Sequence, residues 1–179
     1  MADINLTSVP AHSPPAEARG KEEPAYDLIE LLFFAYRDFV GDADEILAKF
    51  GFGRAHHRVL HFVNRNPGMK VAELLDLLRI TKQSLGRVLK QLIDEGYVEQ
   101  KEGAHDRRQR LLYVTAKGEA LALRLALLQT ARIGRAFAGI SASDRASARR
   151  FLIAMLDPGE RDRVLHLIEA ADRARSRRS

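Results

Sequence analysis

The chain contains no cysteine among its 179 residues. This absence excludes disulfide bonds, zinc–thiolate and iron–sulfur centres, and any switch that depends on oxidation of a thiol. Nowhere does the sequence offer the roughly 18 consecutive apolar residues that a membrane-spanning helix requires. Residues 1–24 also lack the charged start and apolar stretch of a secretory signal. We therefore expect a cytoplasmic protein that does not enter a membrane.

Signs of catalysis are scarce as well. Neither Ser84 nor Ser141 stands in a recognisable nucleophile turn, and the sequence has no glycine-rich loop that would hold a phosphate. No pair of carboxylates is distinguishable from the ordinary background of surface charge. We therefore expect a protein that is not an enzyme and that needs no cofactor.

The chain does have apolar sequence and a surplus of basic charge. Hydrophobic residues make up 46% of the chain, which is enough for a sizeable core. The formal net charge of +5 favours a polyanionic partner only weakly, because many soluble proteins are mildly basic. The length suits one domain, with or without an extension for dimerisation.

The N-terminal part divides into two segments. Residues 1–24 contain four prolines and no hydrophobic period, so we expect a flexible arm. Residues 25–52 form a predicted helix whose apolar side chains occupy most of its circumference, a pattern typical of a helix that is buried on most sides. In a chain of this size we interpret it as an N-terminal dimerisation helix. The apolar residues are Leu28, Ile29, Leu31, Leu32, Phe33, Tyr36 and Phe39.

The middle of the chain, residues 53–118, has the order helix, helix, helix, hairpin. Helices are predicted over residues 54–64 and 71–78, and a third begins after Thr81, whose hydroxyl suits an N-cap. Two alternating segments, residues 97–101 and 110–115, form the one predicted hairpin. The last two helices and the hairpin are typical of a winged helix-turn-helix, in which a helix enters the major groove and the wing reaches the minor groove. The third helix has the apolar arc Leu85, Val88, Leu89 and Leu92 and the polar arc Lys82, Gln83, Gly86, Arg87 and Lys90.

The C-terminal part, residues 119–179, is interpreted as dimerisation helices. A helix predicted over residues 116–139 spans roughly 35 Å, which exceeds the needs of a small domain. A shorter helix over residues 144–156 follows. The last helix starts with Asp157 as N-cap, Pro158 at its first position and Glu160 at its third. The predicted fold is mainly α with one β-hairpin: a winged helix-turn-helix domain flanked by N- and C-terminal dimerisation helices.

Five short motifs of the middle region together resemble the MarR family of bacterial transcriptional regulators. They are Val71-Ala72-Glu73-Leu74-Leu75, Lys82-Gln83-Ser84-Leu85-Gly86-Arg87, Leu92-Ile93-Asp94-Glu95-Gly96-Tyr97-Val98, Asp106-Arg107-Arg108 and Val114-Thr115-Ala116-Lys117-Gly118. The most specific feature is the Asp-Arg-Arg wing with its downstream Thr and Lys-Gly. The resemblance implies a homodimeric regulator, most simply a repressor, whose terminal helices interleave. Each subunit would bind half of a pseudo-palindromic site in double-stranded promoter DNA.

The residue types suggest how DNA would be contacted. The first turn of the third helix reaches base edges, and Gln83 there can pair with adenine. Arg87 suits guanine or phosphate, and the lysines of the polar arc suit phosphate. By resemblance, Arg108 enters the minor groove and Asp106 braces it or its neighbour. The residues expected to contact DNA are Lys82, Gln83, Ser84, Arg87, Lys90, Asp106, Arg107, Arg108 and Arg110.

Each of these features has a simpler interpretation. A basic helix face is often only a solvated surface, and an Asp–Arg pair at a turn is often only a surface ion pair. The alternative function is therefore a winged-helix module that binds protein without specific DNA binding. Removal of Arg108 distinguishes the two functions, because only a DNA reader loses affinity and shows a steep dependence on salt.

The resemblance also implies a small aromatic or carboxylate effector, bound between the winged domain and the dimer helices, that relieves repression. The residues expected to line this site are Phe33, Tyr36, Arg37, His57 and His61. His57 and His61 stand four apart on one helix, a spacing that also suits a shared metal ion. No third ligand is evident, so we expect no metal site and interpret both histidines as packing residues.

Overall fold

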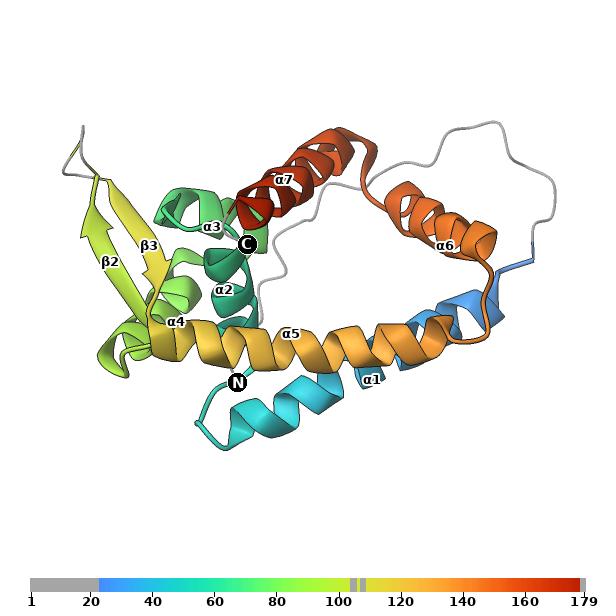
Figure 1. The fold of residues 1–179 in the computed structure, drawn as a ribbon, viewed down its shortest axis with the longest axis horizontal. Helices are drawn as coiled ribbons and strands as arrows, with labels where there is room; N and C mark the ends of the chain where they lie inside the picture. Colours follow the sequence, from blue (N-terminus) through green and yellow to red (C-terminus); the bar gives the residue numbers. More distant parts are fainter. Residues whose placement is uncertain (1–22, 104–105, 107–108, 178–179) are drawn as a thin grey trace, which may run out of the picture.

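The computed structural model describes residues 23–103, 106 and 109–177, and the predicted flexible arm lies almost wholly outside them. Within the described part, the chain is mainly helical with a small antiparallel sheet, as predicted (Figure 1). The helices are α1 (Tyr26–Ala48), α2 (Arg54–Arg65), α3 (Val71–Leu78), α4 (Lys82–Asp94), α5 (Ala116–Phe137), α6 (Ala142–Ala154) and α7 (Pro158–Ser176), and the strands are β1 (Met69–Lys70), β2 (Val98–Glu102) and β3 (Arg110–Val114). None of the described helices is long and apolar enough to cross a membrane.

The sheet has three strands in the order β1-β3-β2, one strand more than the predicted hairpin. The hairpin itself pairs Gln100 with Leu112, and the same Leu112 is paired on its other side with Met69 of β1. The sequence could not indicate β1, because a strand of two residues is too short to show an alternating pattern. Its effect is to attach the start of α3 to the wing.

The core lies in the winged region, between α2, α3, α4, the sheet and the first half of α5. The predicted apolar arc of α4 is confirmed, because all four of its residues are buried. Each fully buried leucine contributes about 2 kcal/mol of apolar burial. The largest fully buried side chains are Leu47, Leu60, Leu74, Leu78, Leu85, Leu92, Leu112, Leu125, Val59, Val63 and Val98.

The starts of α4 and α7 lie where the sequence predicts them. Thr81 Oγ1 accepts a hydrogen bond from the Ser84 amide at 3.1 Å, and Gly96, just past the end of α4, has a φ of +73°. Asp157 and Pro158 occupy the expected positions at the start of α7, but the Asp157 side chain makes no capping hydrogen bond. It faces Arg79 instead.

The helices outside the winged region are poorly covered. Figure 1 shows α5 running from the winged region to the far end of the molecule, where α6 follows, and α7 returning toward α3. Only the C-terminal half of α1 is buried, through Val40, Ala43 and Leu47, while Phe33 exposes 68% of its surface. No residue of α6 is buried. The extension therefore lacks a core of its own within one protomer.

Candidate nucleic-acid interface

Helix α4 presents a polar face directly opposite its buried face. Lys82, Gln83 and Arg87 are exposed, whereas Ser84 is half-buried. This division follows from the helical period, because residues that advance by about 100° each place the polar arc away from the core. Since the side chains at the start of such a helix reach base edges, the exposed Gln83 is well placed to read sequence.

Ser84 is partly committed to the helix start. Its backbone amide donates to Thr81 Oγ1, and its own hydroxyl oxygen accepts a hydrogen bond from the Thr81 hydroxyl at 2.9 Å. The Ser84 hydroxyl can still donate one hydrogen bond outward. The structure thus gives Ser84 a structural role in addition to the predicted contact with DNA.

Lys90 lies one helical turn beyond Arg87 and forms an ion pair with Asp94 on the same helix. Its side chain is 76% exposed, so solvent screens this pair strongly and a phosphate can compete for the ammonium group. Beside it, Gln91 connects α4 to α2, because its amide oxygen lies 2.9 Å from Nε2 of His56. This contact helps to fix α4 against the rest of the winged region.

The base of the wing is described, whereas two of its predicted contact residues are not. Arg107 and Arg108 lie outside the described residues. Asp106 is exposed, and its carbonyl oxygen accepts a hydrogen bond from the Gln109 amide at 3.0 Å. Arg110 pairs with Glu102 across the hairpin at 3.1 Å. Both partners are about half-exposed, so this pair adds little stability and leaves the guanidinium accessible.

A hollow of about 570 Å³ lies between α3, α4 and the base of the wing. It brings together Lys82 at the start of α4 and Arg110 at the base of the wing, which are far apart in sequence. Lys70 and Gln109 line the same hollow and were missed in the sequence, because neither belongs to the polar arc of the helix or to the Asp-Arg-Arg motif. Three basic side chains, Lys70, Lys82 and Arg110, therefore lie around a concave surface between α3, α4 and the wing whose lining is mostly apolar.

The Thr-x-Lys-Gly motif after the wing is structural. The Thr115 hydroxyl donates to the Gly96 carbonyl at 2.7 Å and caps the Gly118 amide at 3.1 Å. Lys117 donates to the Glu95 carbonyl at 2.9 Å and lies over the Tyr97 ring. A side chain at position 118 would lie 2.0 Å from the Tyr97 carbonyl oxygen. The motif locks the start of α5 to the end of α4, a role that spacing alone could not show.

The five predicted effector residues do not share a cavity in one protomer. Phe33, Tyr36 and Arg37 lie on the exposed half of α1, where Arg37 pairs with Asp38 at 2.8 Å. His57 and His61 lie on α2; His57 is buried, whereas His61 lines a hollow of about 320 Å³ between α2, α5 and α7. That hollow also contains Arg65, Glu119 and Arg175. An effector site made of all five residues thus needs a surface from outside this protomer.

Burial favours the neutral form of both His57 and His61. Loss of hydration lowers the pKa of His57 and of His61, because the charged imidazolium is disfavoured inside the protein. Asp44 partly opposes this effect at His57. Neutral histidines suit both packing and metal binding, but among the described residues no group of three or more histidines and carboxylates is placed to hold a metal ion.

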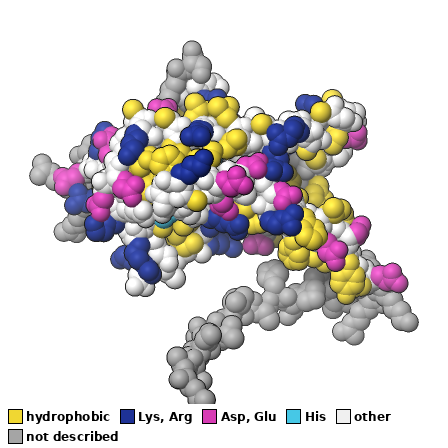
Figure 2. All heavy atoms as spheres, turned by 90° about the horizontal axis from the view of Figure 1, so that it is seen from below, with side chains coloured by type: hydrophobic (Ala, Val, Ile, Leu, Met, Phe, Trp, Pro, Cys, Tyr) yellow, Lys and Arg dark blue, Asp and Glu magenta, His cyan; other side chains and the backbone are white. Residues whose placement is uncertain are grey.

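Large apolar side chains are exposed on the helical extension. Figure 2 shows hydrophobic side chains over the middle of the face seen from below and at the end away from the wing, with Lys and Arg side chains among them. The exposed large apolar residues of α1, α5 and α6 include Leu31, Phe33, Leu127, Phe151 and Leu152. So many exposed large apolar side chains on a protein of this size indicate an interface with another molecule.

The winged region and most of the chain have known relatives. The MarR family model matches residues 50–109, from the end of α1 through the wing loop. The HTH-type transcriptional regulator PetP of Rhodobacter capsulatus is 47% identical to the chain over 133 residues, which are 74% of this chain and 80% of that protein. The similarity therefore extends well beyond the region matched by the family model.

Solved structures share the fold. FabT of Streptococcus pneumoniae, solved in complex with DNA, has a TM-score of 0.65 at 17% identity and covers 73% of this chain and 93% of its own. A MarR family protein of Mycobacterium tuberculosis, solved with salicylic acid, has a TM-score of 0.54 at 26% identity and covers 76% of this chain and 98% of its own. Both alignments include more of the chain than the winged region alone.

Proposed function

We propose that this chain, which belongs to the MarR family of transcriptional regulators, represses transcription by binding a pseudo-palindromic promoter site as a homodimer. Members of the family are DNA-binding regulators without enzymatic activity, and the chain is a regulator and not an enzyme. The observation that carries the proposal is the exposed face of α4 with Lys82, Gln83 and Arg87, beside a wing whose base carries Arg110.

The proposed contacts follow from the position of each side chain. Gln83 reads base edges in the major groove, and Arg87 contacts guanine or phosphate. Lys82 and Lys90 neutralise phosphates on either side and set the register of the protein on DNA. At the wing, Arg107 and Arg110 face phosphates while Arg108, braced by Asp106, enters the minor groove.

The proposed dimer uses the helical extension: the N-terminal helix of residues 25–52 and the helices of residues 119–179, with residues 53–118 as the DNA-binding region. Burial of the apolar faces of α1, α5 and α6 against a second copy would remove from water the surface that one protomer leaves exposed. A twofold dimer then presents two α4 helices to successive major grooves, which is why the operator would be a pseudo-palindrome.

We further propose that a small aromatic or carboxylate ligand relieves repression. The support is the hollow between α2, α5 and α7, where His61, Arg65 and Arg175 supply groups that suit a carboxylate. The relative from Mycobacterium tuberculosis was solved with salicylic acid, a ligand of this class. In the dimer, Phe33, Tyr36 and Arg37 of one copy and His57 of the other would complete the site.

Fluorescence anisotropy on DNA from the protein's own upstream region, against scrambled DNA, tests the DNA-binding proposal. Wild-type binding should be selective and should fall steeply as salt rises, because phosphate contacts release counterions. Arg87→Ala and Arg108→Ala should each weaken binding by about 1–3 kcal/mol. The matched control is Arg149→Ala on α6, which removes the same charge away from the proposed interface.

Equal, weak binding to both DNAs, unchanged by Arg87→Ala and Arg108→Ala, would contradict the proposal. That result would favour the alternative function, a winged-helix module that binds protein. A loss of affinity in the Arg149→Ala control, with the dimer shown to be intact by sedimentation, would show that net charge, and not the position of the arginine, governs binding. A protein that binds selectively but never blocks transcription from the bound promoter in vitro would contradict repression only.

A further inference from the structure

The turn between α3 and α4 contains a strained arginine. Arg79 ends α3 with φ of +49° and ψ of +47°, and it is the one non-glycine residue with positive φ in the described part of the chain. Glycine adopts this left-handed conformation without steric cost, whereas a residue with a β-carbon does not. A strained residue that persists where glycine would be relaxed points to a role for its side chain.

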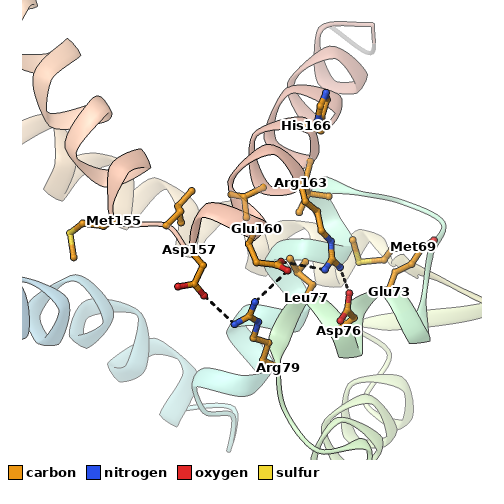
Figure 3. Close-up of a pocket in the computed structure, with 13 residues that line it drawn as sticks. Met69, Glu73, Asp76, Leu77, Arg79, Met155, Asp157, Glu160, Arg163 and His166 are labelled. Atoms are coloured by element: carbon orange, nitrogen blue, oxygen red, sulfur yellow. Dashed lines mark hydrogen bonds and ion pairs between the residues drawn. The ribbon is translucent and has the colours of Figure 1, made fainter. Parts of the chain in front are cut away.

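The Arg79 side chain reaches the start of α7. Its two terminal nitrogens lie 3.5 Å from carboxylate oxygens of Asp157 and Glu160, which are 78 and 81 positions further along the chain (Figure 3). A second bridge runs in the opposite direction, from Arg163 of α7 to Asp76 of α3. Glu160 also contacts Arg163 at 3.4 Å, so the two bridges share one carboxylate.

These bridges span a cleft rather than a packed interface. A cavity of about 630 Å³ separates this part of α7 from α3, and Met69, Leu77 and Met155 lie along it. The C-terminal half of α7, by contrast, is packed, because Ala171 is buried and Asp172 pairs with Arg65 of α2 at 2.7 Å. Helix α7 is thus held at one end by packing and at the other by ion pairs across open space.

Exposed ion pairs contribute little to stability, and here the Arg79 side chain is 63% exposed. Their contribution in this position is geometric. Arg79 stands two residues before Thr81, the N-cap of α4, and Arg58 of α2 anchors the same turn by donating to the Leu78 carbonyl at 2.8 Å. Because α4 and this turn are both held to α2, a shift of α7 relative to the turn changes the orientation of the whole winged region, α4 included, relative to the helical extension.

We infer that Arg79 is a positioning residue that connects the turn between α3 and α4, the helix proposed to enter the major groove, to the C-terminal helices. It thereby fixes the distance between the two α4 helices of a dimer and hence the spacing of half-sites that the protein accepts. The inference rests on the proposed function, because a fixed distance between two α4 helices has meaning only in a dimer. The cleft beside the bridge leaves room for α7 to move once Arg79 is released.

Spin labelling measures that distance directly. Because the chain contains no cysteine, Lys90→Cys introduces one labelling site per protomer, on the exposed face of α4. Pulsed electron paramagnetic resonance then reports the distance between the two labels in the dimer. In an otherwise wild-type chain the distance distribution should be narrow. Arg79→Gly should broaden it about twofold, and the pair Asp157→Asn with Glu160→Gln should have the same effect.

Two further variants separate positioning from a merely structural role. Arg79→Gly should leave the melting temperature unchanged or raise it, since glycine relieves the strain at φ of +49°. The charge exchange Arg79→Asp with Asp157→Arg, made together with Glu160→Gln so that no carboxylate faces the new aspartate, should restore a narrow distribution, which no effect on the backbone alone would do. Arg173→Ala is the matched control, because Arg173 pairs with Glu169 within α7 and bridges no cleft.

The looser distance between the two α4 helices in Arg79→Gly should also show in DNA binding. On duplexes that the wild-type chain selects from a random-sequence pool, insertion of one base pair between the half-sites should lower wild-type affinity about tenfold. Arg79→Gly should show a clearly smaller loss, because its two α4 helices adjust to the new spacing.

The possible outcomes distinguish a failure of the role inferred for Arg79 from a failure of the proposed dimer. A dimer distance that neither Arg79→Gly nor the Asp157 and Glu160 pair changes would overturn the role of Arg79 while leaving the proposed dimer intact. Broadening that the charge exchange fails to reverse would overturn it as well. The complete absence of a distance between labels in the wild-type background would overturn the dimer, and the positioning role with it.

Discussion

Leu74 of α3 is fully buried, whereas Leu152 of α6 exposes 61% of its surface. The same contrast separates the whole winged region from the helical extension. The winged region is buried within one protomer, because the end of α1 and the first half of α5 complete the core that α2, α3, α4 and the sheet form. The rest of the extension exposes large apolar side chains on α1, α5 and α6. The difference teaches that the part of the chain that carries the DNA-facing residues is covered within one protomer, while the far half of the extension needs a second surface.

A charge at the centre of the exposed face of α1 should have the largest effect. Phe33→Glu would remove apolar burial of about 2 kcal/mol from each copy and about 4 kcal/mol from a symmetric dimer, which is about a thousandfold in dissociation constant. Sedimentation across a concentration series measures the change. Lys49→Glu, at the exposed end of α1, alters charge without removing apolar surface and serves as the control. A wild-type chain that remains monomeric at all concentrations would contradict the prediction.

Two glycines of α5 test the contrast along one helix. Gly118→Ala should destabilise the fold by about 3 kcal/mol, because the new methyl group would lie 2.0 Å from the Tyr97 carbonyl oxygen. Gly134→Ala, where nothing lies within 4 Å, should stabilise the helix by about 0.5–1 kcal/mol. Urea denaturation followed by circular dichroism measures both changes. Equal effects of the two substitutions would show that the start of α5 is less tightly held than its contacts indicate.

The caps of α5 and α6 allow the same comparison between the winged region and the extension, with a smaller expected effect on stability. Thr115 caps α5 in the winged region, and Ser141 caps α6 in the extension by accepting from the Asp144 amide at 3.2 Å. Thr115→Ala should cost about 1 kcal/mol of global stability. Ser141→Ala should only fray α6 locally, since no residue of α6 is buried. Hydrogen exchange distinguishes the two, because only local fraying leaves amide protection in the core unchanged.

The smallest effect should come from pH. Burial lowers the pKa of His57 below its ordinary value of 6.5, so the native state resists protonation that the unfolded chain accepts. His57 therefore imposes no penalty above pH 6.5, and stability is lost as the pH falls below 6.5. His57→Gln should flatten the dependence of the unfolding free energy between about pH 7.5 and about pH 5.5. A pH dependence that His57→Gln leaves unchanged would contradict the assignment.

Helical period was the most informative signal in the sequence. It predicted the buried arc of α4 and the exposed position of Lys82, Gln83 and Arg87, because a strong amphipathic pattern fixes which side of a helix meets the core. It also predicted that α1 is buried on most sides; within one protomer the first half of α1 is exposed, and its burial in a dimer stays a prediction. Arg107 and Arg108 stay predictions, since they lie outside the described residues.

Contacts between distant segments were beyond the reach of the sequence. Strand β1 has two residues, and its identity depends on pairing with β3 more than forty positions away. Asp157 is the N-cap of α7 as predicted, but its carboxylate faces Arg79 of another helix and makes no capping hydrogen bond. The hollow that unites Lys82 with Arg110 has the same origin. Local pattern fixes the elements, whereas these relations depend on how the elements are folded together.

The contacts that hold the start of α5 reduce the size of a displacement that passes from the far end of α5 to the tip of α4. Because Thr115 and Gly118 fasten that start to Tyr97, α5 and α4 turn about a common root. The 22 residues of α5 form an arm of about 33 Å, and the 13 residues of α4 form one of about 20 Å. A displacement of about 1.5 Å at the far end of α5 then moves the tip of α4 by only about 0.9 Å. A motion at the dimer end would therefore reach the DNA reduced to about three fifths of its size.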